Sequence, residues 1–397
     1  MQNFTYYTPT EIIFGRSAEK EAGRLAAKWN AKKVLIVYGG GSAVRSRLLA
    51  VIEAELDIEG IAWDTLSGVR PNPRLALARE GVKTGVAFGA DLVLAVGGGS
   101  VIDTAKAVAI GAANPGTDLW DFWTGKVGKP KQVLPVGVVL TIAAAGSETS
   151  DSAVLTNEET GTKKGYGGDF VRPKFALMNP ELAATLPRYQ LACGVVDILM
   201  HTLERYFTPV EGNHLTDEIA EGLMRTIICE GKKVYDNPAD YDAMSEVMWC
   251  GSLSHNGLTG LGRGKDFSCH KLGHEIGGMF DEAHGATLSA VWGSWARYVY
   301  RQDIARFVRY GRKVWGIDGD AAGEDEIALA AIRRTEDFFR SLDMPVCLGE
   351  LGMGVQPEGV LQKMADSATN GGTVKLGSFC PMDAEDMVAI YQCANHV

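Results

Sequence analysis

The second half of the chain carries residues with the chemistry of a metal site. Asp197 and His201 are four residues apart in GVVDILMHTLERYF, and His270, His274 and His284 follow in CHKLGHEIGGMFDEAHG. Positions i and i+4 share one face of a helix, so each close pair can reach one ion. One carboxylate with imidazoles suits Fe²⁺ or Zn²⁺ and would also accept Mn²⁺ or Co²⁺. An ion with an open position acts as a Lewis acid on an alcohol or carbonyl oxygen.

These residues alone do not establish a metal site. An isolated Asp–His pair at this spacing is usually an ordinary hydrogen bond, and about one such match in ten is a ligand pair. Three histidines within residues 270–284 strengthen the metal interpretation. Four ligands are needed and five candidates are present, so the spacing leaves open which residue stays outside the shell.

Two glycine-rich turns in the first half form a second candidate site. GGGS at 97–100 follows the expected strand DLVLAV and precedes an expected helix, and GGGS at 39–42 follows an earlier strand. Glycines let the backbone approach a ligand closely, and the N–H groups of a helix start can hold a diphosphate. The spacing is neither G-x-x-x-x-G-K-[ST] nor G-x-G-x-x-G, so a nucleoside triphosphate P-loop is excluded and a plain tight turn remains the alternative.

The residues beside the earlier turn bear on the choice of coenzyme. Dinucleotide folds use an acidic residue here to bind the ribose 2′-hydroxyl of NAD, and its absence admits the 2′-phosphate of NADP. Ser42 follows the glycines, and Arg45 and Arg47 lie just beyond. The pattern favours NADP, although a plain turn with two solvated arginines gives the same sequence. In a third small-residue turn, at 141–149, the hydroxyls either line a cofactor pocket or cap a helix.

The elements that would position these residues divide the chain into two parts. Short apolar strands alternate with helices in the first part, as in a parallel sheet covered on both faces. The strands are expected at 32–38, 60–66, 91–96 and 133–140, with helices at 44–56, 73–88 and from 101. Residues 4–7 and 11–14 are expected to form a hairpin or an edge strand. Amphipathic helices are expected at 189–207, 213–235, 241–260, 268–280 and 286–315.

The predicted architecture is therefore α/β plus all-α. A Rossmann-like dinucleotide-binding domain is expected over residues 1–185, and an all-helical metal-binding and substrate domain over residues 186–397. A chain of 397 residues with 46% hydrophobic and 22% charged residues suits two well-packed domains. A net charge of −10 argues against nucleic acid or an anionic membrane as partner. Scattered cysteines and an N-terminus unlike a signal peptide favour the cytoplasm.

Several motifs, in this order and spacing, resemble those of the iron-containing (group III) alcohol dehydrogenases. They cover nearly the whole chain and are EIIFG, YGGGS, PNP at 71–73, VGGGSVID, GSETS, GVVDILMHTLE, NGL at 256–258 and H-x-x-x-H…AHG. The branch that the chain resembles most contains NADPH-dependent butanol dehydrogenases and aldehyde reductases. Ala283 and Gly273 depart from the commoner proline and alanine of the family, which leaves the range of substrates open.

The resemblance implies a role for each candidate residue. Implied metal ligands are Asp197, His201, His270 and His284, and His274 is placed outside the shell, in the nicotinamide and substrate pocket. Implied contacts at the adenosine end of the coenzyme are Gly40, Gly41 and Ser42. Implied contacts along the phosphates and ribose are Asn72, Gly98, Gly99, Ser100 and Asp103. Implied contacts toward the nicotinamide are Thr141, Ser147 and Lys163.

The expected activity is the reversible oxidation of short-chain primary alcohols, such as butanol, to aldehydes by hydride transfer to NADP. One Fe²⁺ or Zn²⁺ would assist, in a cytoplasmic homodimer. His274 either relays a proton or only shapes the pocket. One alternative is a dehydroquinate-synthase-like lyase, or another group III relative, acting on a polyol or phosphorylated substrate. Trp249, Trp292 and Trp295 either make the site apolar, which does not suit a phosphate, or are simply core residues. A non-catalytic NADP-binding or metal-storage protein is a further alternative, which the intact ligands and loops disfavour.

Overall fold

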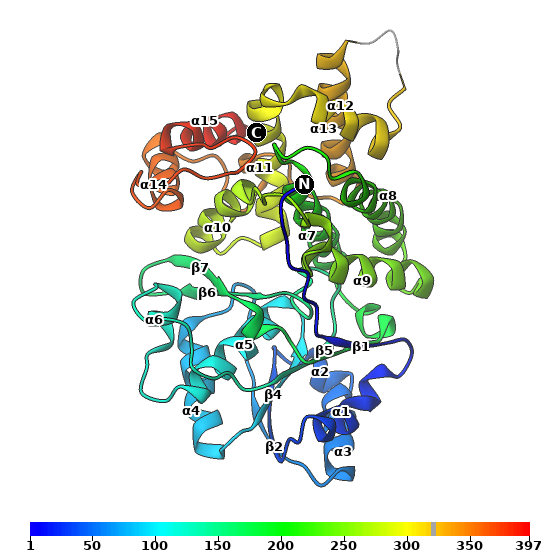
Figure 1. The fold of residues 1–397 in the computed structure, drawn as a ribbon, viewed down its shortest axis with the longest axis vertical. Helices are drawn as coiled ribbons and strands as arrows, with labels where there is room; N and C mark the ends of the chain where they lie inside the picture. The colour runs from blue at the N-terminus through cyan, green and yellow to red at the C-terminus, as the bar shows by residue number, and fades with distance from the viewer. Residues whose placement is uncertain (319–322) are drawn as a thin grey trace. The chain divides into compact units, whose positions relative to one another are not determined.

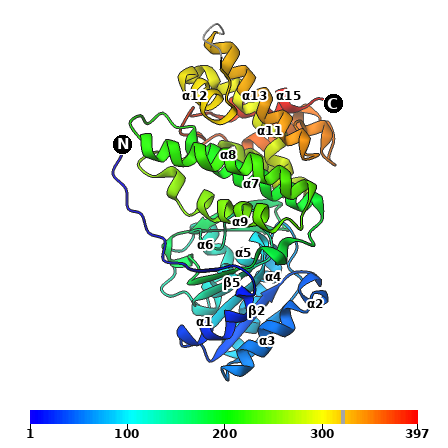
Figure 2. The ribbon, with the colours of Figure 1, turned by 90° about the vertical axis from the view of Figure 1, so that its right-hand side faces the viewer.

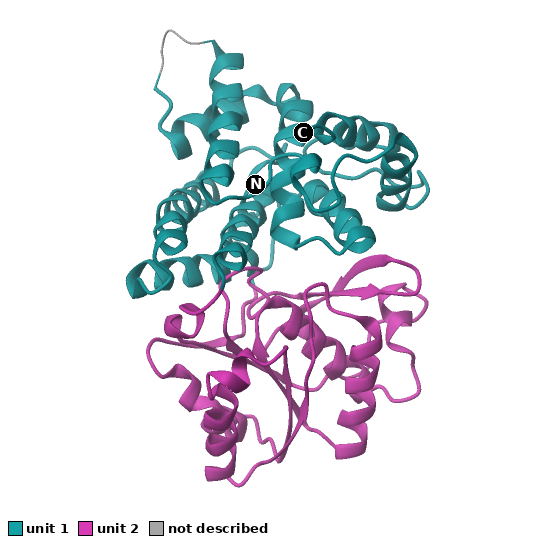
Figure 3. Cartoon of the chain, turned by 180° about the vertical axis from the view of Figure 1, so that it is seen from behind, with its two compact units in different colours: residues 1–6, 187–397 teal, residues 7–186 magenta. Residues whose placement is uncertain are grey.

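The computed structural model describes residues 1–318 and 323–397, and these form two compact units (Figure 3). One unit is Tyr7–Leu186. The other joins Met1–Tyr6 to Pro187–Val397. The first six residues therefore group with the second half of the chain, which the predicted 1–185 domain did not anticipate.

The unit Tyr7–Leu186 is built on a parallel sheet with helices on both faces (Figure 1). Its elements are β1 Glu11–Phe14, α1 Ala22–Lys28, β2 Lys33–Tyr38, α2 Ser42–Arg45, α3 Leu48–Ile58, β3 Ala62–Leu66, α4 Leu75–Phe88, β4 Leu92–Gly97, α5 Gly99–Ala113, α6 Leu119–Trp123, β5 Val136–Leu140, β6 Ser152–Asn157, β7 Thr162–Gly167 and β8 Phe175–Met178. Val34 and Ile36 of β2 pack with α1 and α3, whereas Leu35 lies beside Gly85 of α4. Burial on both faces explains the continuously apolar strands and confirms the Rossmann-like class.

Three details of the first half of the chain differ from the prediction. Residues 4–7 form no strand, so the hairpin alternative was wrong, whereas β1 confirms the edge-strand alternative for residues 11–14 by pairing in parallel with β8 at the edge of the sheet. The helix expected over 44–56 is two helices, because Arg47 takes a left-handed conformation with φ 61° between α2 and α3. The antiparallel pair of β6 and β7 was not predicted, because Lys163, Lys164 and Gly165 interrupt the apolar alternation of β7.

The register of the sheet brings the three small-residue turns to one edge. The strand order is β1-β8-β5-β4-β2-β3. Tyr38 at the end of β2 pairs with Val96, and Gly97 at the end of β4 pairs with Leu140 at the end of β5. The connections from β2 and β4 diverge, since β3 lies on one side and β5 on the other. Ligands of open α/β sheets bind at the carboxyl ends of the strands at such a switch point.

The other unit is helical, as predicted (Figure 2). Its helices are α7 Arg188–Tyr206, α8 His214–Asp236, α9 Tyr241–His255, α10 Ser268–Phe280, α11 His284–Val299, α12 Ile304–Trp315, α13 Glu324–Ser341, α14 Glu358–Ala368 and α15 Ala384–Ala394. The largely buried α7 packs against α8, α9 and α11. The helix expected over 286–315 divides into α11 and α12, because the Asp303 side chain caps the start of α12 by accepting the Arg306 N–H.

No helix in residues 1–318 or 323–397 combines the length and the apolar character that a membrane span requires. The expected strand at 133–140 shortens to β5 because the chain enters the sheet only after Pro135, whose carbonyl accepts the Val93 N–H at 3.0 Å. Proline has no N–H to donate to a ladder, so it lies at the start of this strand.

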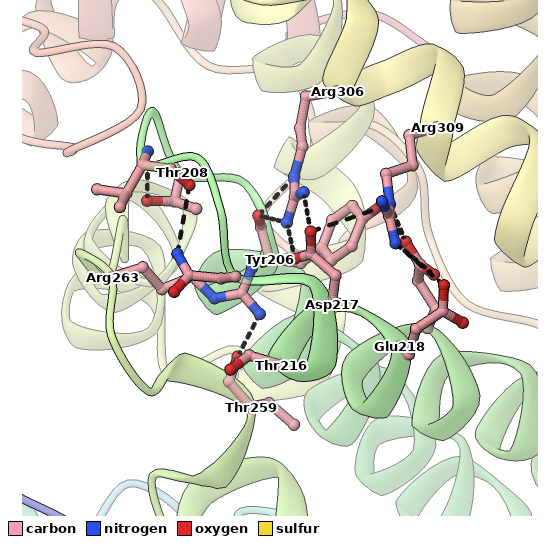
Figure 4. Close-up of polar contacts among 12 residues, drawn as sticks. Tyr206, Thr208, Thr216, Asp217, Glu218, Thr259, Arg263, Arg306 and Arg309 are labelled. Carbon is pink, nitrogen blue, oxygen red and sulfur yellow. Dashed lines mark hydrogen bonds and ion pairs between the residues drawn. The ribbon is translucent and has the colours of Figure 1, made fainter. Parts of the chain in front are cut away.

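A buried ionic cluster ties α7, α8 and α12 together (Figure 4). Asp217 on α8 accepts hydrogen bonds from Arg263 and from Arg306, whose Nη1 and Nη2 lie 2.8 and 2.6 Å from the carboxylate. Arg306 Nη2 also donates to the carbonyl of Tyr206 at 2.6 Å. Burial alone would raise the pKa of Asp217, but the hydrogen bonds and charges of Arg306 and Arg263 hold this pKa below its ordinary value.

The Asp217→Asn substitution is expected to lower the free energy of unfolding by about 3 kcal/mol at neutral pH, because two buried arginines lose their carboxylate. Folding lowers the pKa of Asp217, so its stabilisation is complete above the pKa of an unfolded aspartate, about 3.9. The stabilisation is lost as the pH falls through the lower folded value. In urea unfolding, wild type and variant should converge in acid, while the exposed Asp337→Asn control matches wild type throughout. Equal stability of Asp217→Asn and wild type at neutral pH would contradict this role.

Candidate functional site

Three helices bring the predicted metal-binding residues to one point. Asp197 and His201 lie one turn apart on α7, and their side chains are 6% and 4% exposed. The distance from His201 Nδ1 to Asp197 Oδ1 is 3.5 Å. His270 on α10 and His284 at the first position of α11 place their Nε2 atoms 3.6 and 3.7 Å from the same oxygen. Three histidines from α7, α10 and α11 thus converge on one carboxylate oxygen, that of Asp197.

The geometry and the donor set fit one divalent ion. Neighbouring ligand atoms around a tetrahedral ion with bonds of about 2.1 Å are about 3.4 Å apart, close to the distances from Asp197 Oδ1. The donor atoms of Asp197, His201 and His270 all lie within 4.8 Å of one another. Asp197 Oδ1, His201 Nδ1 and His270 Nε2 are buried without a hydrogen-bond partner among the described residues. Buried polar atoms without partners are costly, and an ion among them supplies the missing interaction.

The surroundings give two of the histidines different protonation states. Burial, followed by the influence of His255 and His270, lowers the pKa of His201 well below its ordinary value, so this ring is neutral as a ligand must be. Burial alone would also lower the pKa of His270, but Glu204, together with Asp197, raises it to about 9. An ion at His270 Nε2 therefore displaces a proton, and metal affinity should rise as the pH approaches 9.

His274 lies beside the converging residues. It is one turn beyond His270 on α10, half-buried, with its ring centroid 6.2 Å from that of His270. Its centroid is 5.3 Å from that of His284. The described donor atoms that meet within 4.8 Å are those of Asp197, His201 and His270, so neither His274 nor His284 belongs to this group. His284 differs from His274 in that its Nε2 lies 3.7 Å from Asp197 Oδ1. The position of His274 beside these residues is compatible with the predicted role next to an ion.

Two neighbours of the metal-binding residues were missed by the sequence prediction. His255, the last residue of α9, places its ring edge-on to His201 at a centroid distance of 4.0 Å. Its one signal is that it directly precedes the NGL motif. Glu204 binds the ring and the backbone of His270. Its signal is its position three residues after His201 on the same helix, which indicates a shared face but no partner.

Of the three tryptophans considered for the lining of the site, two are core residues and one is exposed. Trp295 and Trp292 are fully buried in an aromatic core, with ring centroids 5.9 Å from Phe207 and 6.1 Å from Phe339, respectively. Trp249 is 41% exposed. The tryptophans therefore say nothing about the polarity of the substrate, and the argument that they disfavour a phosphorylated substrate was wrong.

Gly285 allows α11 to approach α7 next to the metal-binding residues. A Cβ atom added to Gly285 would lie 2.3 Å from the carbonyl oxygen of Cys193, one turn before Asp197. Backbone on both sides leaves no flexible group that can yield. A methyl group would therefore push the start of α11, and His284 with it, away from α7.

We expect Gly285→Ala to lower the free energy of unfolding by about 2 kcal/mol, as overpacking of a core contact does, and to weaken Zn²⁺ binding. Urea unfolding and competition with a chelator measure the two effects. Gly359→Ala is the matched control, since a Cβ atom at this helical position meets nothing within 4 Å. Unchanged Zn²⁺ affinity in Gly285→Ala would show that this close approach does not position His284.

The turn after β4 has the form of a diphosphate-binding turn. Gly97 ends β4 and Gly99 begins α5. A Cβ atom at Gly98 would lie 2.0 Å from Ile142 Cγ2, and one at Gly99 would lie 3.1 Å from Ala145 Cβ, so the turn after β5 packs directly on these glycines. The first N–H groups of α5, which include that of Ser100, have no partner within the helix and can bind an anion.

The turn after β2 presents an unpaired cation beside Ser42. Gly41 adopts φ 118°, a conformation that favours glycine, and Ser42 begins α2. The exposed Arg45 folds back over the turn, with Nη1 3.0 Å from the place of a Cβ atom on Gly41. Within residues 1–318 and 323–397, no ion pair or hydrogen bond engages this guanidinium. Together with the exposed Gly40, these groups can accept a phosphate.

Buried polar contacts organise the turn after β5. Asp103 accepts the Ser147 hydroxyl at 2.6 Å and the Val154 N–H at 2.9 Å. Lys106 is fully buried, and its Nζ lies 2.7–3.2 Å from backbone and hydroxyl oxygens of Ser147 and Ser150. Burial lowers the pKa of Lys106 to about 8, which leaves it charged at neutral pH. Ser147 is therefore held by both an anion and a cation of α5.

Three further residues are predicted to contact the coenzyme. Lys163 and Asn72 contact each other, and Thr141 contacts the turn after β4. Lys163 Nζ donates to Asn72 Oδ1 at 2.9 Å, and both side chains are buried. Asn72 has φ 56°, which asparagine tolerates better than most residues. The Thr141 N–H donates to the Gly97 carbonyl at 3.2 Å, which joins the turns after β5 and β4.

Comparison with known proteins extends over the whole chain. Residues 9–180 match the family model for iron-containing alcohol dehydrogenase, and residues 191–395 match the C-terminal model of the Fe-containing alcohol dehydrogenase family. NADH-dependent butanol dehydrogenase A of Clostridium acetobutylicum is 40% identical over 99% of both chains. NADPH-dependent aldehyde reductase YqhD of Escherichia coli is 34% identical over 99% of this chain and 100% of its own. The crystal structure of NADH-dependent butanol dehydrogenase A from Thermotoga maritima superposes with a TM-score of 0.94 at 35% identity, covering 100% of this chain and 99% of the other.

Proposed function

Because the chain belongs to the iron-containing alcohol dehydrogenase family, we propose that it interconverts short-chain primary alcohols, such as butanol, and their aldehydes with NADP(H) and one divalent metal. The observation that carries the metal dependence is the convergence of His201, His270 and His284 on Asp197 Oδ1, with buried atoms left without a partner among the described residues. Relatives named as butanol dehydrogenases and as an aldehyde reductase support the substrate class.

The residues of the chain have distinct tasks in this reaction. Asp197 and the three histidines would hold Fe²⁺ or Zn²⁺, which supplies Lewis acidity toward the oxygen of an alcohol or aldehyde. Gly98, Gly99 and Ser100, at the start of α5, would hold the coenzyme diphosphate, and the nicotinamide supplies the hydride. Lys106 and Asp103 would keep Ser147 in a fixed position at the same edge of the sheet.

His274 is the proposed proton-exchanging residue. Reduction of an aldehyde requires one proton at the oxygen in addition to the hydride, and an imidazole titrates near neutral pH. The position of His274 next to His270 and His284 supports contact with a substrate oxygen held at the same centre. The alternative is that this ring only shapes the pocket.

The preference for NADP(H) rests on the turn after β2. The 2′-phosphate of NADP carries negative charge, and Ser42 presents a hydroxyl where an acidic residue would select NAD. Arg45 folds over the same turn with its charge unpaired among the described residues. These two side chains favour the phosphate over a hydroxyl, although the relatives at 40% and 34% identity carry names with different coenzymes.

A kinetic comparison of coenzymes and substrates tests the proposal. Oxidation of NADPH and of NADH by butanal is followed at the absorbance of the reduced nicotinamide. The same measurement is made with aldehydes of increasing chain length, a polyol-derived aldehyde and a phosphorylated aldehyde. We expect the highest kcat/KM with NADPH and a short unbranched aldehyde. A higher kcat/KM with NADH would overturn the coenzyme assignment, and turnover only with the polyol or phosphorylated substrate would overturn the substrate class.

A further inference from the structure

Glu204 holds two parts of one histidine at once. Its carboxylate is almost completely buried, with the side chain 1% exposed. Oε1 accepts the backbone N–H of His270 at 3.0 Å, and Oε2 pairs with Nδ1 of the same residue. His270 lies in the first turn of α10, where backbone N–H groups have no partner within the helix. Glu204, which lies on α7, therefore caps the start of α10 and also binds the imidazole ring of His270.

The hydrogen bond between Glu204 and His270 Nδ1 determines which ring nitrogen of His270 is available to an ion. A carboxylate can only accept, so Nδ1 must donate its hydrogen to Oε2. The lone pair of the neutral ring is then on Nε2, the atom that lies 3.6 Å from Asp197 Oδ1 without a hydrogen-bond partner. A carboxylate hydrogen-bonded to the far nitrogen of a histidine orients the ring and makes it a stronger metal ligand.

The sequence of α7 places this carboxylate in line with two of the metal-binding residues. Asp197, His201 and Glu204 occupy positions i, i+4 and i+7, which share one face of a helix. One face of α7 thus supplies two donors and the group that orients a third donor on α10. Because the contact joins residues 66 positions apart, it also fixes the start of α10 against α7.

A second buried carboxylate, that of Asp266, allows the helix-capping role of Glu204 to be tested separately from its contact with the His270 ring. Asp266 accepts the Ser268 N–H at 3.1 Å and thereby caps the same end of α10. It also accepts the N–H of Phe379 at 2.9 Å. Among the described residues, the side chain of Asp266 bonds to Ser268 and Phe379 and to no histidine ring, so Asp266 caps α10 as Glu204 does but lacks the ring contact. If Glu204 mattered only as a cap, loss of either carboxylate would affect the metal site alike.

We propose that Glu204 is a positioning residue that presents His270 Nε2 to the metal and raises metal affinity through its hydrogen bond to Nδ1. This inference rests on the proposed metal centre. The direct test is Zn²⁺ affinity, measured by competition with a chelator, in wild type, Glu204→Gln and Asp266→Asn. Glu204→Gln keeps the size of the side chain but loses the charge. We expect Zn²⁺ affinity to fall roughly 10- to 100-fold in Glu204→Gln and to stay within about twofold of wild type in Asp266→Asn.

A spectroscopic measurement on the same proteins reports the ligand itself. With Co²⁺ in place of Zn²⁺, the visible absorption bands should shift in Glu204→Gln and coincide with wild type in Asp266→Asn, because only the first change alters the His270 ligand. An equal loss of Zn²⁺ affinity in both variants, or unchanged affinity and bands in Glu204→Gln, would overturn the role of Glu204. Failure of wild type to bind Zn²⁺ would instead overturn the proposed metal centre.

The inference can be tested without any substitution of Glu204. The chain has seven histidines, so ¹⁵N-histidine labelling of the Zn²⁺-loaded wild type gives few ring signals. The His270 signals are assigned by their loss in His270→Gln. We expect a hydrogen on Nδ1 that exchanges slowly with water, as a buried N–H bound to a carboxylate does. A His270 ring with its hydrogen on Nε2, or without one on Nδ1, would contradict the proposed orientation.

Discussion

Replacing His270 with alanine is expected to abolish Zn²⁺ or Fe²⁺ binding and to lower the turnover of butanal with NADPH by about 10³-fold or more. The substitution removes one of the donors around Asp197 Oδ1 and leaves Glu204 without the ring that it orients. Lewis-acid assistance is worth several kcal/mol, and each 1.4 kcal/mol of lost transition-state stabilisation costs about a factor of ten in rate. Metal analysis of the dialysed protein and steady-state kinetics measure the two losses.

The same variant should leave coenzyme binding almost unchanged. The turns implicated in binding NADP(H) belong to Tyr7–Leu186, whereas His270 belongs to the helical unit. We therefore expect the dissociation constant for NADPH, measured by fluorescence, to stay within about twofold of wild type. His214→Ala is the matched control, because His214 is exposed at the start of α8 and should affect neither metal nor turnover. Normal metal content and turnover in His270→Ala would refute its assignment as a ligand.

Replacing Ser42 with aspartate is expected to lower the ratio of kcat/KM for NADPH to that for NADH by about 10³-fold. A carboxylate about 4 Å from a phosphate repels it by about 4 kcal/mol at an effective dielectric constant of 20. Each 1.4 kcal/mol corresponds to a factor of about ten in affinity. The new carboxylate can also accept a hydrogen bond from the 2′-hydroxyl of NADH, which adds to the change.

A variant with the same added charge is the control for the change in the NADPH to NADH ratio. Ser17→Asp adds the same charge to the same unit, on an exposed residue that follows β1, which is the edge strand on the side of the sheet away from β2 and β3. We expect its NADPH to NADH ratio to equal that of wild type. If Ser42→Asp also left the ratio unaltered, the turn after β2 would have no part in coenzyme selection.

Much of the framework could be predicted because it depends on local patterns. The apolar runs of β2 and β4 and the helical spacing of α7 and α10 carry their own periodicity, and helical spacing pairs Asp197 with His201. The hairpin of β6 and β7 could not be predicted, because polar residues and glycine mask its alternation. The split at Arg47 was also hidden, since nothing in its side chain requires a positive φ.

The rest of the site depends on contacts between distant residues. Glu204 and His270 are 66 positions apart, and only the packing of α10 on α7 makes them partners. His255 reaches His201 from the end of α9 for the same reason. The tryptophans illustrate the opposite case, because Trp292 and Trp295 follow His284 on α11 and could line the site or belong to the core, and the structure buries both in the core. Residue type and spacing therefore identified the candidate metal ligands, whereas the packing of the helices determined which residues contact them.

The measurement that tests the metal-dependent mechanism most directly is a titration of metal-free protein with Fe²⁺ and, separately, with Zn²⁺. Bound metal and NADPH-dependent reduction of butanal are measured on the same samples at each step. We predict that turnover rises in proportion to bound metal, reaches its maximum at about one ion per chain, as a single site requires, and is lost when a chelator removes the ion. Full turnover in the metal-free protein, or turnover that does not follow the bound metal, would contradict the account.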